Sequence, residues 1–194
     1  MDPAPAFEWH EHHFINGIVC LDFANTVVYR NLPSRREDRL GTLANLRSWF
    51  AAAGLRGKHD LTLREAIGLR EAIDSLFRGI AVGKPLPSEI WPTFIKQYSR
   101  SATRHSVKPT AQGLGLIANT ADPFLAIAHS ALTLALSPSS SRIKICGGCG
   151  WLFVDRTRNS SKKWCISSMC GARDKARRYY TRKVRNLSRP GKSG

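Results

Sequence analysis

The sequence predicts an α+β protein in two parts: a mixed domain of helices and a β-hairpin in residues 1–136, and a smaller module in residues 142–194. A short linker at residues 137–141 joins them. The length of 194 residues suits this division, because domains cluster near about 100–150 residues. The hydrophobic share of 42% is high enough for a packed core. Charge separates the parts: the smaller module carries 15 basic and two acidic residues, a net charge of +13, whereas the first 141 residues carry +3.

The first element predicted is a β-hairpin near the N-terminal end. Asn16-Gly17 lies between two apolar segments, and this pair favours the tight turn of a hairpin. Apolar residues alternate with other residues along 19–23, which predicts a strand with one buried face. The arginine-rich segment 30–39 that follows is expected to be an exposed loop.

Three helices are expected next. Apolar residues recur at helical spacing over 40–53, which predicts the first. Thr62 and Glu65 match a capping box, in which each side chain accepts a hydrogen bond from the backbone of the other, and the second helix extends from there to Gly83. The third is expected over residues 88–98.

A strand and a buried helix complete the larger domain. Residues 113–118 are apolar and punctuated by glycine, which predicts the strand. Asp122 followed by Pro123 is typical of a helix start, since the carboxylate caps free backbone N–H groups and proline suits the first turn. The helix that follows is apolar on almost all sides, so we expect it to lie in the centre of the domain.

Four cysteines in the smaller module have the spacing C-x2-C-x15-C-x4-C. They are Cys146, Cys149, Cys165 and Cys170. Four thiolates complete the tetrahedral shell of a zinc ion and leave no open position, so the pattern predicts one structural zinc site. The alternatives are four unrelated thiols or a redox-sensitive zinc site. The fifth cysteine, Cys20, is expected to be a buried free thiol.

The segments between the cysteines predict a small hairpin. Residues 151–155 alternate like a short strand, and residues 158–160 resemble a turn. Trp151 and Trp164 are expected to form the small core of the module.

The chain beyond Cys170 predicts a long basic helix, because it contains good helix formers and no proline up to residue 187. Five basic residues recur at steps of three and four and form one stripe: Lys175, Arg178, Arg182, Arg185 and Arg189. A mainly apolar face is expected to pack against the protein: Ala172, Ala176, Tyr180, Val184 and Leu187. We expect the basic face to bind nucleic acid; the alternative is a solvated charged face. The candidate contacts are Arg158, Lys162, Lys163, Arg173, Lys175, Arg177, Arg178, Arg182, Lys183 and Arg185.

The module carries a specific pattern: after the first cysteine pair come Trp151-x-Phe153-x-Asp155, Thr157-Arg158-Asn159, Trp164-Cys165 and Cys170-Gly171-Ala172-Arg173. This pattern resembles the CGNR zinc-finger family of bacterial stress-responsive transcription regulators. Residues 19–26 are similar to the start of the alpha-beta domain called ABATE that precedes the finger in that family. The resemblance implies a treble-clef zinc finger, whose helix supplies the last ligand, and DNA binding. Ala172 stands where the family has its eponymous asparagine, whereas Arg173 is retained.

Other polar residues are weaker candidates for sites. Asp22, Asn25 and Thr26 are candidates for a ligand pocket, with backbone capping as the alternative. The cluster of His10, His12 and His13 with Glu8 and Glu11 could bind a metal, although a solvated terminus is the favoured interpretation. His129 is expected to be a hydrogen-bonded core residue.

The sequence indicates no enzyme and no membrane protein. It contains no G-x-S-x-G, P-loop or G-x-G-x-x-G motif, and no histidine follows His129. The longest apolar run, residues 124–136, is shorter than the roughly 20 residues that span a bilayer. The N-terminal residues 1–11 lack the pattern of a signal peptide, so a location in the bacterial cytosol or nucleoid is expected.

Three functional hypotheses follow. The first is a DNA-binding transcription regulator whose N-terminal domain senses a ligand or mediates assembly. The second is an RNA- or ribosome-associated zinc protein, which needs the same charge. The third is a ligand-binding or weakly enzymatic N-terminal domain with the finger as a protein-interaction module. An unknown small-molecule effector and a homodimer are compatible with each.

Overall fold

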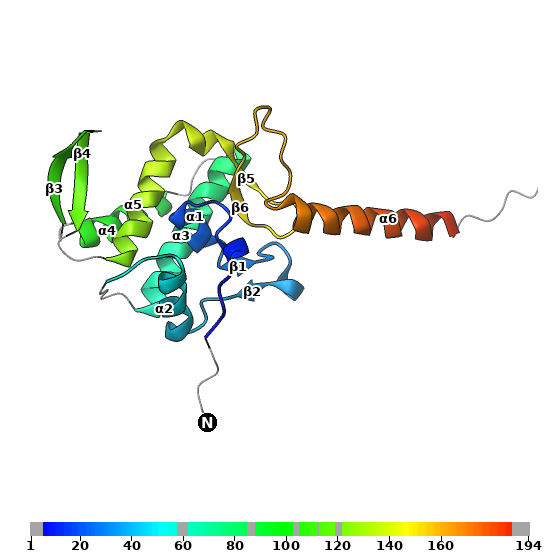
Figure 1. Ribbon diagram of the computed structural model, residues 1–194, viewed down its shortest axis with the longest axis horizontal. Helices are drawn as coiled ribbons and strands as arrows, with labels where there is room; N and C mark the ends of the chain where they lie inside the picture. Colours follow the sequence, from blue (N-terminus) through cyan, green and yellow to red (C-terminus); the bar gives the residue numbers. More distant parts are fainter. Residues whose placement is uncertain are drawn as a thin grey trace, which may run out of the picture.

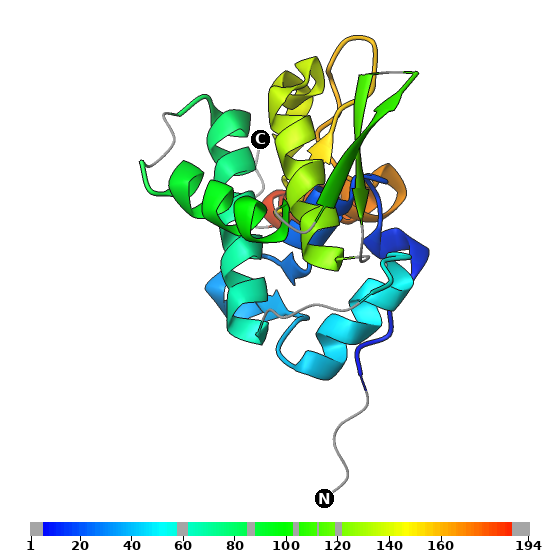
Figure 2. The same ribbon diagram turned by 90° about the vertical axis from the view of Figure 1, so that its left-hand side faces the viewer.

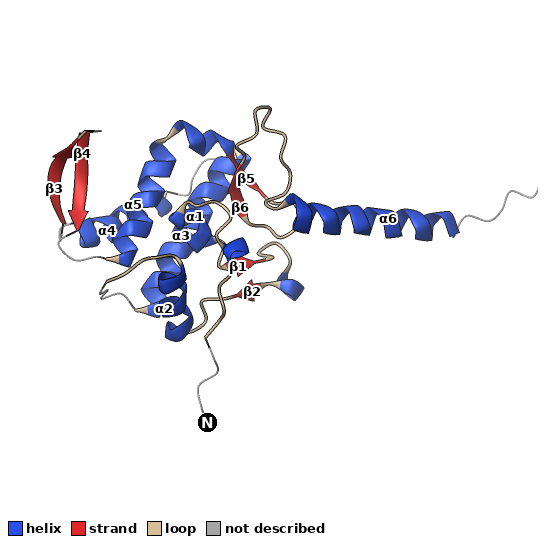
Figure 3. Ribbon diagram, in the orientation of Figure 1, coloured by secondary structure: helices blue, strands red, loops and turns tan. Residues whose placement is uncertain are grey.

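The computed structural model describes residues 6–57, 62–84, 88–102, 105–111, 113–118 and 122–187. Helices make up most of this part, and the strands form three separate two-stranded antiparallel sheets (Figure 3), which confirms the α+β prediction. The β3–β4 hairpin lies at one end of the molecule and α6 extends from the other (Figure 1).

The two long helices of the larger domain begin at the predicted caps. Helix α3 (Leu63–Val82) has the Thr62–Glu65 capping box, with Thr62 Oγ1 accepting from the Glu65 N–H at 3.2 Å and Glu65 Oε2 accepting from the Thr62 N–H at 2.9 Å. Helix α5 (Pro123–Leu136) begins where the Asp122 carboxylate accepts from two backbone N–H groups. Helices α3 and α5 both pack on α1 (Val19–Ala24), and α4 (Ile90–Ala102) packs on α3 and α5 (Figure 2).

The remaining elements surround this centre. Helix α2 spans Leu43–Ala52, and the predicted strand β4 (Gly113–Ala118) pairs with β3 (His105–Thr110). The two-residue strands β1 (Val27–Val28) and β2 (Glu37–Asp38) pair with each other in an antiparallel ribbon. Three short helical turns are η1 (Glu11–His13), η2 (Pro33–Arg35) and η3 (Pro138–Arg142). No helix in these described ranges is long and apolar enough to cross a membrane.

The segment predicted to be a β-strand after Asn16 is helix α1. Residues 20–24 are all buried, so the helix has no solvent face and the alternation in its sequence does not mark a strand. The turn at Gly17 has φ +59°, and the Asn16 side chain donates to Asp22 Oδ1 at 3.0 Å. The Asn16-Gly17 pair therefore leads into a helix, and the Asn16 side chain is hydrogen-bonded to that helix. The hairpin prediction is wrong.

The core extends from the larger domain into the smaller module. The strands β5 (Ile143–Ile145) and β6 (Leu152–Val154) form a hairpin, and Ile143 and Leu152 belong to the same buried cluster as Trp49 and Phe77. Residues 138–142 form the turn η3, which packs against α3 and α5. The first half of the module is thus part of the main hydrophobic core.

Candidate metal centre and nucleic-acid interface

The four predicted ligands meet at one point. Cys146 and Cys149 lie in the turn between β5 and β6, and Cys170 lies in the short helical segment η4 (Ser167–Gly171). All four sulfur atoms lie within 4.8 Å of one another, with 3.6 Å between Cys149 and Cys165 and 3.8 Å between Cys165 and Cys170. A tetrahedral ion with Zn–S bonds of about 2.3 Å requires sulfur atoms about 3.8 Å apart. The arrangement therefore fits one zinc ion.

The surroundings of the sulfurs explain why a cation is needed. All five cysteines are free thiols, and the four of the cluster are buried. The hydrogen bond with the Cys146 sulfur, together with burial, raises the pKa of Cys149. Four adjacent thiolates would repel one another in this buried position, and a divalent ion removes that repulsion. The filled shell leaves no coordination position for a substrate, so the zinc is structural.

The finger also has its own small apolar core. Trp151 is buried, and Trp164 packs on the cysteine cluster, as predicted. The Trp164 ring lies against Gly147, where a Cβ atom would come within 2.8 Å of it. Any larger residue at position 147 would displace the ring that covers the metal site.

Asp155 organises the loop that leads from β6 to the third ligand. Its buried carboxylate receives hydrogen bonds from Lys144 Nζ at 2.7 Å, Thr157 Oγ1 at 2.6 Å and the Lys162 N–H at 2.8 Å. Burial opposes ionisation, but these hydrogen bonds outweigh it and lower the pKa of Asp155. The predicted turn at 158–160 forms within this loop, but the chain that follows it is not a strand.

Of the three residues predicted to line a ligand pocket, Asn25 attaches the finger to the larger domain. Asn25, Asp22 and Thr26 are buried. The Asn25 amide donates to the Leu152 carbonyl at 2.9 Å and accepts from the Leu152 N–H at 2.8 Å. Thr26 Oγ1 donates to a backbone carbonyl of α1, and Asp22 accepts from Asn16. Because protein groups occupy these polar atoms, the contacts favour a structural role, such as the capping alternative, over a ligand pocket.

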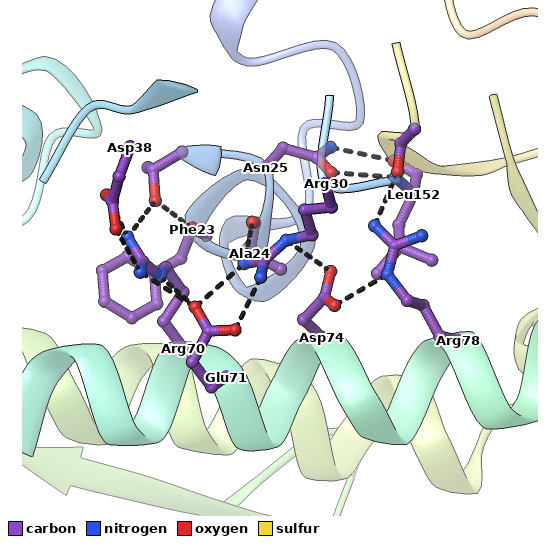
Figure 4. A network of polar contacts seen from close by, with 12 residues as sticks. Phe23, Ala24, Asn25, Arg30, Asp38, Arg70, Glu71, Asp74, Arg78 and Leu152 are labelled. Carbon is purple, nitrogen blue, oxygen red and sulfur yellow. Dashed lines mark hydrogen bonds and ion pairs between the residues drawn. The ribbon is translucent and has the colours of Figure 1, made fainter. Parts of the chain in front are cut away.

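A network of alternating charges runs along α3 to the metal knuckle, the turn that carries the first two cysteines (Figure 4). The contacts are Asp38–Arg70 at 2.6 Å, Arg70–Glu71 at 2.8 Å, Glu71–Arg30 at 2.6 Å, Arg30–Asp74 at 3.2 Å, Asp74–Arg78 at 2.7 Å and Arg78 to the Gly150 carbonyl at 2.6 Å. Burial opposes ionisation of Asp38 and Glu71, but the arginines outweigh it and lower the pKa of both carboxyl groups. Sequence reasoning missed this network, although charged residues recur every four positions on α3 from Arg70 to Arg78.

The basic helix is present, but it does not pack as predicted. Helix α6 (Ala172–Leu187) continues from η4 and projects from the body of the protein (Figure 1). Every side chain from residue 175 to residue 184 is exposed, including Tyr179 at 63% and Tyr180 at 64%. Ala172 and Ala176 are exposed as well. The prediction of a packed apolar face is wrong for Ala172, Ala176, Tyr180 and Val184, because the helix leaves the surface of the protein at its first turn. The side chain of Leu187 lies outside the described part.

The structure places most of the predicted nucleic-acid contacts on the surface. Half-buried Lys162 is the exception; the exposed ones are Arg158, Lys163, Arg173, Lys175, Arg177, Arg178, Arg182 and Lys183. Asp174 pairs with Arg177 at 2.7 Å and with Arg178 at 2.8 Å. Arg189 and the side chain of Arg185 lie outside the described part.

The histidines and Cys20 do not form a second metal site within the described ranges. His13 is buried and packs against Trp151, and this burial lowers the pKa of His13 to about 4. This part of the N-terminal segment is therefore not a solvated tail. His129 is exposed and its ring stacks with Tyr98 at 6.4 Å, which corrects its assignment to the core. Cys20 is a buried free thiol as predicted, although it lies on a helix, and burial raises its pKa to about 12.

A structural four-cysteine zinc site next to an exposed basic helix defines a zinc-finger protein. Residues 142–183 match the model of the CGNR zinc finger. Residues 17–138 match the ABATE model, which is described as "Putative stress-induced transcription regulator" and covers more than half of the chain. The chain therefore belongs to the ABATE family and carries a CGNR zinc finger, as the sequence pattern indicated. A comparison with curated proteins found no match.

Proposed function

We propose that the protein is a transcription regulator that binds duplex DNA with α6 and the basic loop between β6 and η4. The observation that carries this proposal is the projecting helix, whose 16 residues include seven lysines and arginines and one acidic residue. At about 1.5 Å per residue it is roughly 24 Å long, enough to follow or cross a groove. Each phosphate that it neutralises releases counterions, which makes the affinity depend on salt.

The shape of the helix favours DNA over RNA. Side chains are exposed around the whole circumference of α6 after its first turn, so nothing in the described protein hinders its insertion. The major groove of B-form DNA is about 12 Å wide and admits an α-helix. The major groove of A-form RNA is deep and narrow and does not. Arg158 and Lys163, in the loop before η4, add exposed charge to the same module.

The larger domain fixes the position of the finger. Hydrogen bonds from Asn25 and Arg78 hold β6 and the knuckle, so a ligand or partner that moved α1 or α3 would also move the finger. This link supports the proposal that the larger domain senses a ligand or mediates assembly. We place the regulator in the bacterial cytosol, at the nucleoid.

Binding to duplex DNA and to structured RNA, each at two salt concentrations, tests the proposal. Changing Lys175, Arg178 and Arg182 together to alanine should weaken DNA binding at least tenfold and reduce the salt slope by about 0.9 for each phosphate that is no longer neutralised. The matched control changes three exposed arginines of the larger domain to alanine: Arg47, Arg56 and Arg64. Equal effects of both triple changes, or tighter binding to structured RNA than to DNA, would contradict the proposal.

A further inference from the structure

A cavity of about 300 Å³ lies where the arginine-rich segment of the larger domain meets the start of α6. Tyr29 and Arg35 line it from the larger domain. Arg173 and Arg177 line it from the finger, beside Gly148 and Cys170. The two family domains therefore each contribute a guanidinium group to one hollow next to the metal site.

Tyr29 joins the two sides of this cavity. Its N–H donates to the Cys149 carbonyl at 2.8 Å, and its φ of +55° lies in the left-handed region. The Arg35 guanidinium lies 4.1 Å from the centre of the Tyr29 ring, and Arg173 donates to the Tyr29 hydroxyl at 3.2 Å. A strained residue of this kind persists only where its surroundings hold it, and such residues concentrate at functional sites. Tyr29 thus orients one arginine from each domain.

The charge of the cavity favours a phosphate. Arg35 and Arg173 have no carboxylate partner among the described residues. Asp174 also borders the cavity, but Arg177 and Arg178 neutralise it. A zinc ion with four thiolates carries a net negative charge, which would repel an anion from this edge of the finger. Arg35 and Arg173 offset that repulsion, and a guanidinium group can donate two parallel hydrogen bonds to a phosphate.

We propose that Arg35 and Arg173, oriented by Tyr29, bind a backbone phosphate of the DNA, so that the larger domain is itself part of the DNA interface. This inference rests on the function proposed above. Arg177 borders the cavity and also belongs to the exposed basic surface of α6, so the phosphate site and the helix form one continuous surface. Phosphate contacts fix the register of a protein on a duplex. The cavity would therefore set how α6 enters the groove.

Replacing one exposed arginine tests this inference. Arg35→Gln removes one charge from the cavity, and Arg47→Gln removes one from an exposed position of α2, away from the cavity. We expect Arg35→Gln to weaken duplex binding several-fold and to reduce the slope of log affinity against log salt by about 0.9, whereas Arg47→Gln changes neither. Arg35→Lys should restore the slope, because the charge is kept. Zinc content and thermal unfolding of each variant verify that the fold is intact.

The outcomes separate this inference from the function on which it rests. If the unaltered protein binds no duplex DNA, the proposed function fails and the phosphate site fails with it. If it binds and Arg35→Gln keeps the original salt slope, only the inference is overturned. Titration with inorganic phosphate gives a further check: loss of phosphate binding in Arg35→Gln, with unchanged DNA binding, would show a site for a free anion and would overturn the inference.

Discussion

The two halves of the finger share one metal site but lie in opposite environments. The β5–β6 hairpin contributes Ile143 and Leu152 to the main core, and Asn25 holds its backbone. Helix α6 is exposed from residue 175 to residue 184. The hairpin therefore contributes mainly to stability, whereas the helix contributes charge. Substitutions in one half should leave the role of the other intact.

Loss of the metal should have the largest effect on the stability of the finger, because the metal ion connects its two halves. Cys165→Ser removes one ligand, and structural zinc sites contribute about 10–16 kcal/mol of apparent binding free energy in peptides. We expect loss of most bound zinc, a fall in melting temperature of more than about 10 °C and loss of the helical signal of α6. Metal analysis and circular dichroism measure these quantities. Cys20→Ala is the control and should keep a full equivalent of zinc; a Cys165→Ser variant that also keeps it would contradict the assignment.

Breaking the charge network should have the next largest effect. Asp74→Asn removes the buried carboxylate that pairs with Arg30 and with half-buried Arg78. Removing one partner of a buried ion pair costs about 3–5 kcal/mol. Urea denaturation should show this loss in the free energy of unfolding. Glu8→Gln, which changes a carboxyl group whose side chain is 84% exposed, serves as the control and should leave stability unchanged. A loss below about 0.5 kcal/mol for Asp74→Asn would mean that the network does not hold the knuckle.

The pH dependence of stability should reveal the ionisation of Asp22, a buried residue of α1. Burial raises its pKa to about 6 in the folded protein, compared with about 3.9 in an unfolded chain. The folded state thus binds the proton more tightly, so the stabilisation is present below about pH 4 and is lost as pH rises through about 6. Relative to Asp22→Asn, the unaltered protein should lose about 2–3 kcal/mol between pH 4 and 7.5.

Urea denaturation of both proteins across this pH range makes the comparison. The difference between them cancels the contributions of the other carboxyl groups, such as Glu71, whose pKa is lowered. A difference that does not change with pH would contradict the raised pKa of Asp22.

The smallest effect on stability is expected from the projecting helix. The combined Lys175, Arg178 and Arg182 alanine variant removes exposed side chains and one ion pair to Asp174. Exposed ion pairs contribute about 0–1 kcal/mol, and alanine favours the helix, so the free energy of unfolding should change by less than about 1 kcal/mol. Thermal unfolding of this variant measures the change. A large destabilisation would show that the basic face of α6 has a structural role.

Local signals in the sequence predicted the helix boundaries well, because caps depend on residues three positions apart. Thr62 with Glu65 and Asp122 with Pro123 both begin helices as predicted. The four cysteines were also predictable, since their spacing alone suits one ion. Alternation failed at α1 because that helix is only six residues long and buried on nearly all sides, so its sequence has no periodic contrast.

Features that depend on distant partners could not be predicted. The apolar residues of α6 suggested a packed face, but packing requires a neighbouring element, and the helix extends beyond the body of the protein. Asn25 was a candidate for a ligand pocket. Its actual partner, Leu152, could not be foreseen because it lies 127 positions away in the sequence. Arg30 and Glu71 pair across 41 positions, and nothing in either local sequence marks that contact.

Hydrogen exchange with and without duplex DNA tests most directly the claim that one half of the finger is anchored and the other binds DNA. A helix with so little tertiary packing is marginally stable in water, so the amides of α6 should exchange quickly in the free protein and slowly in the complex. The amides of β5 and β6 should exchange slowly in both states. Protection on DNA binding that is confined to α2 and α5, with α6 unchanged, would contradict this account.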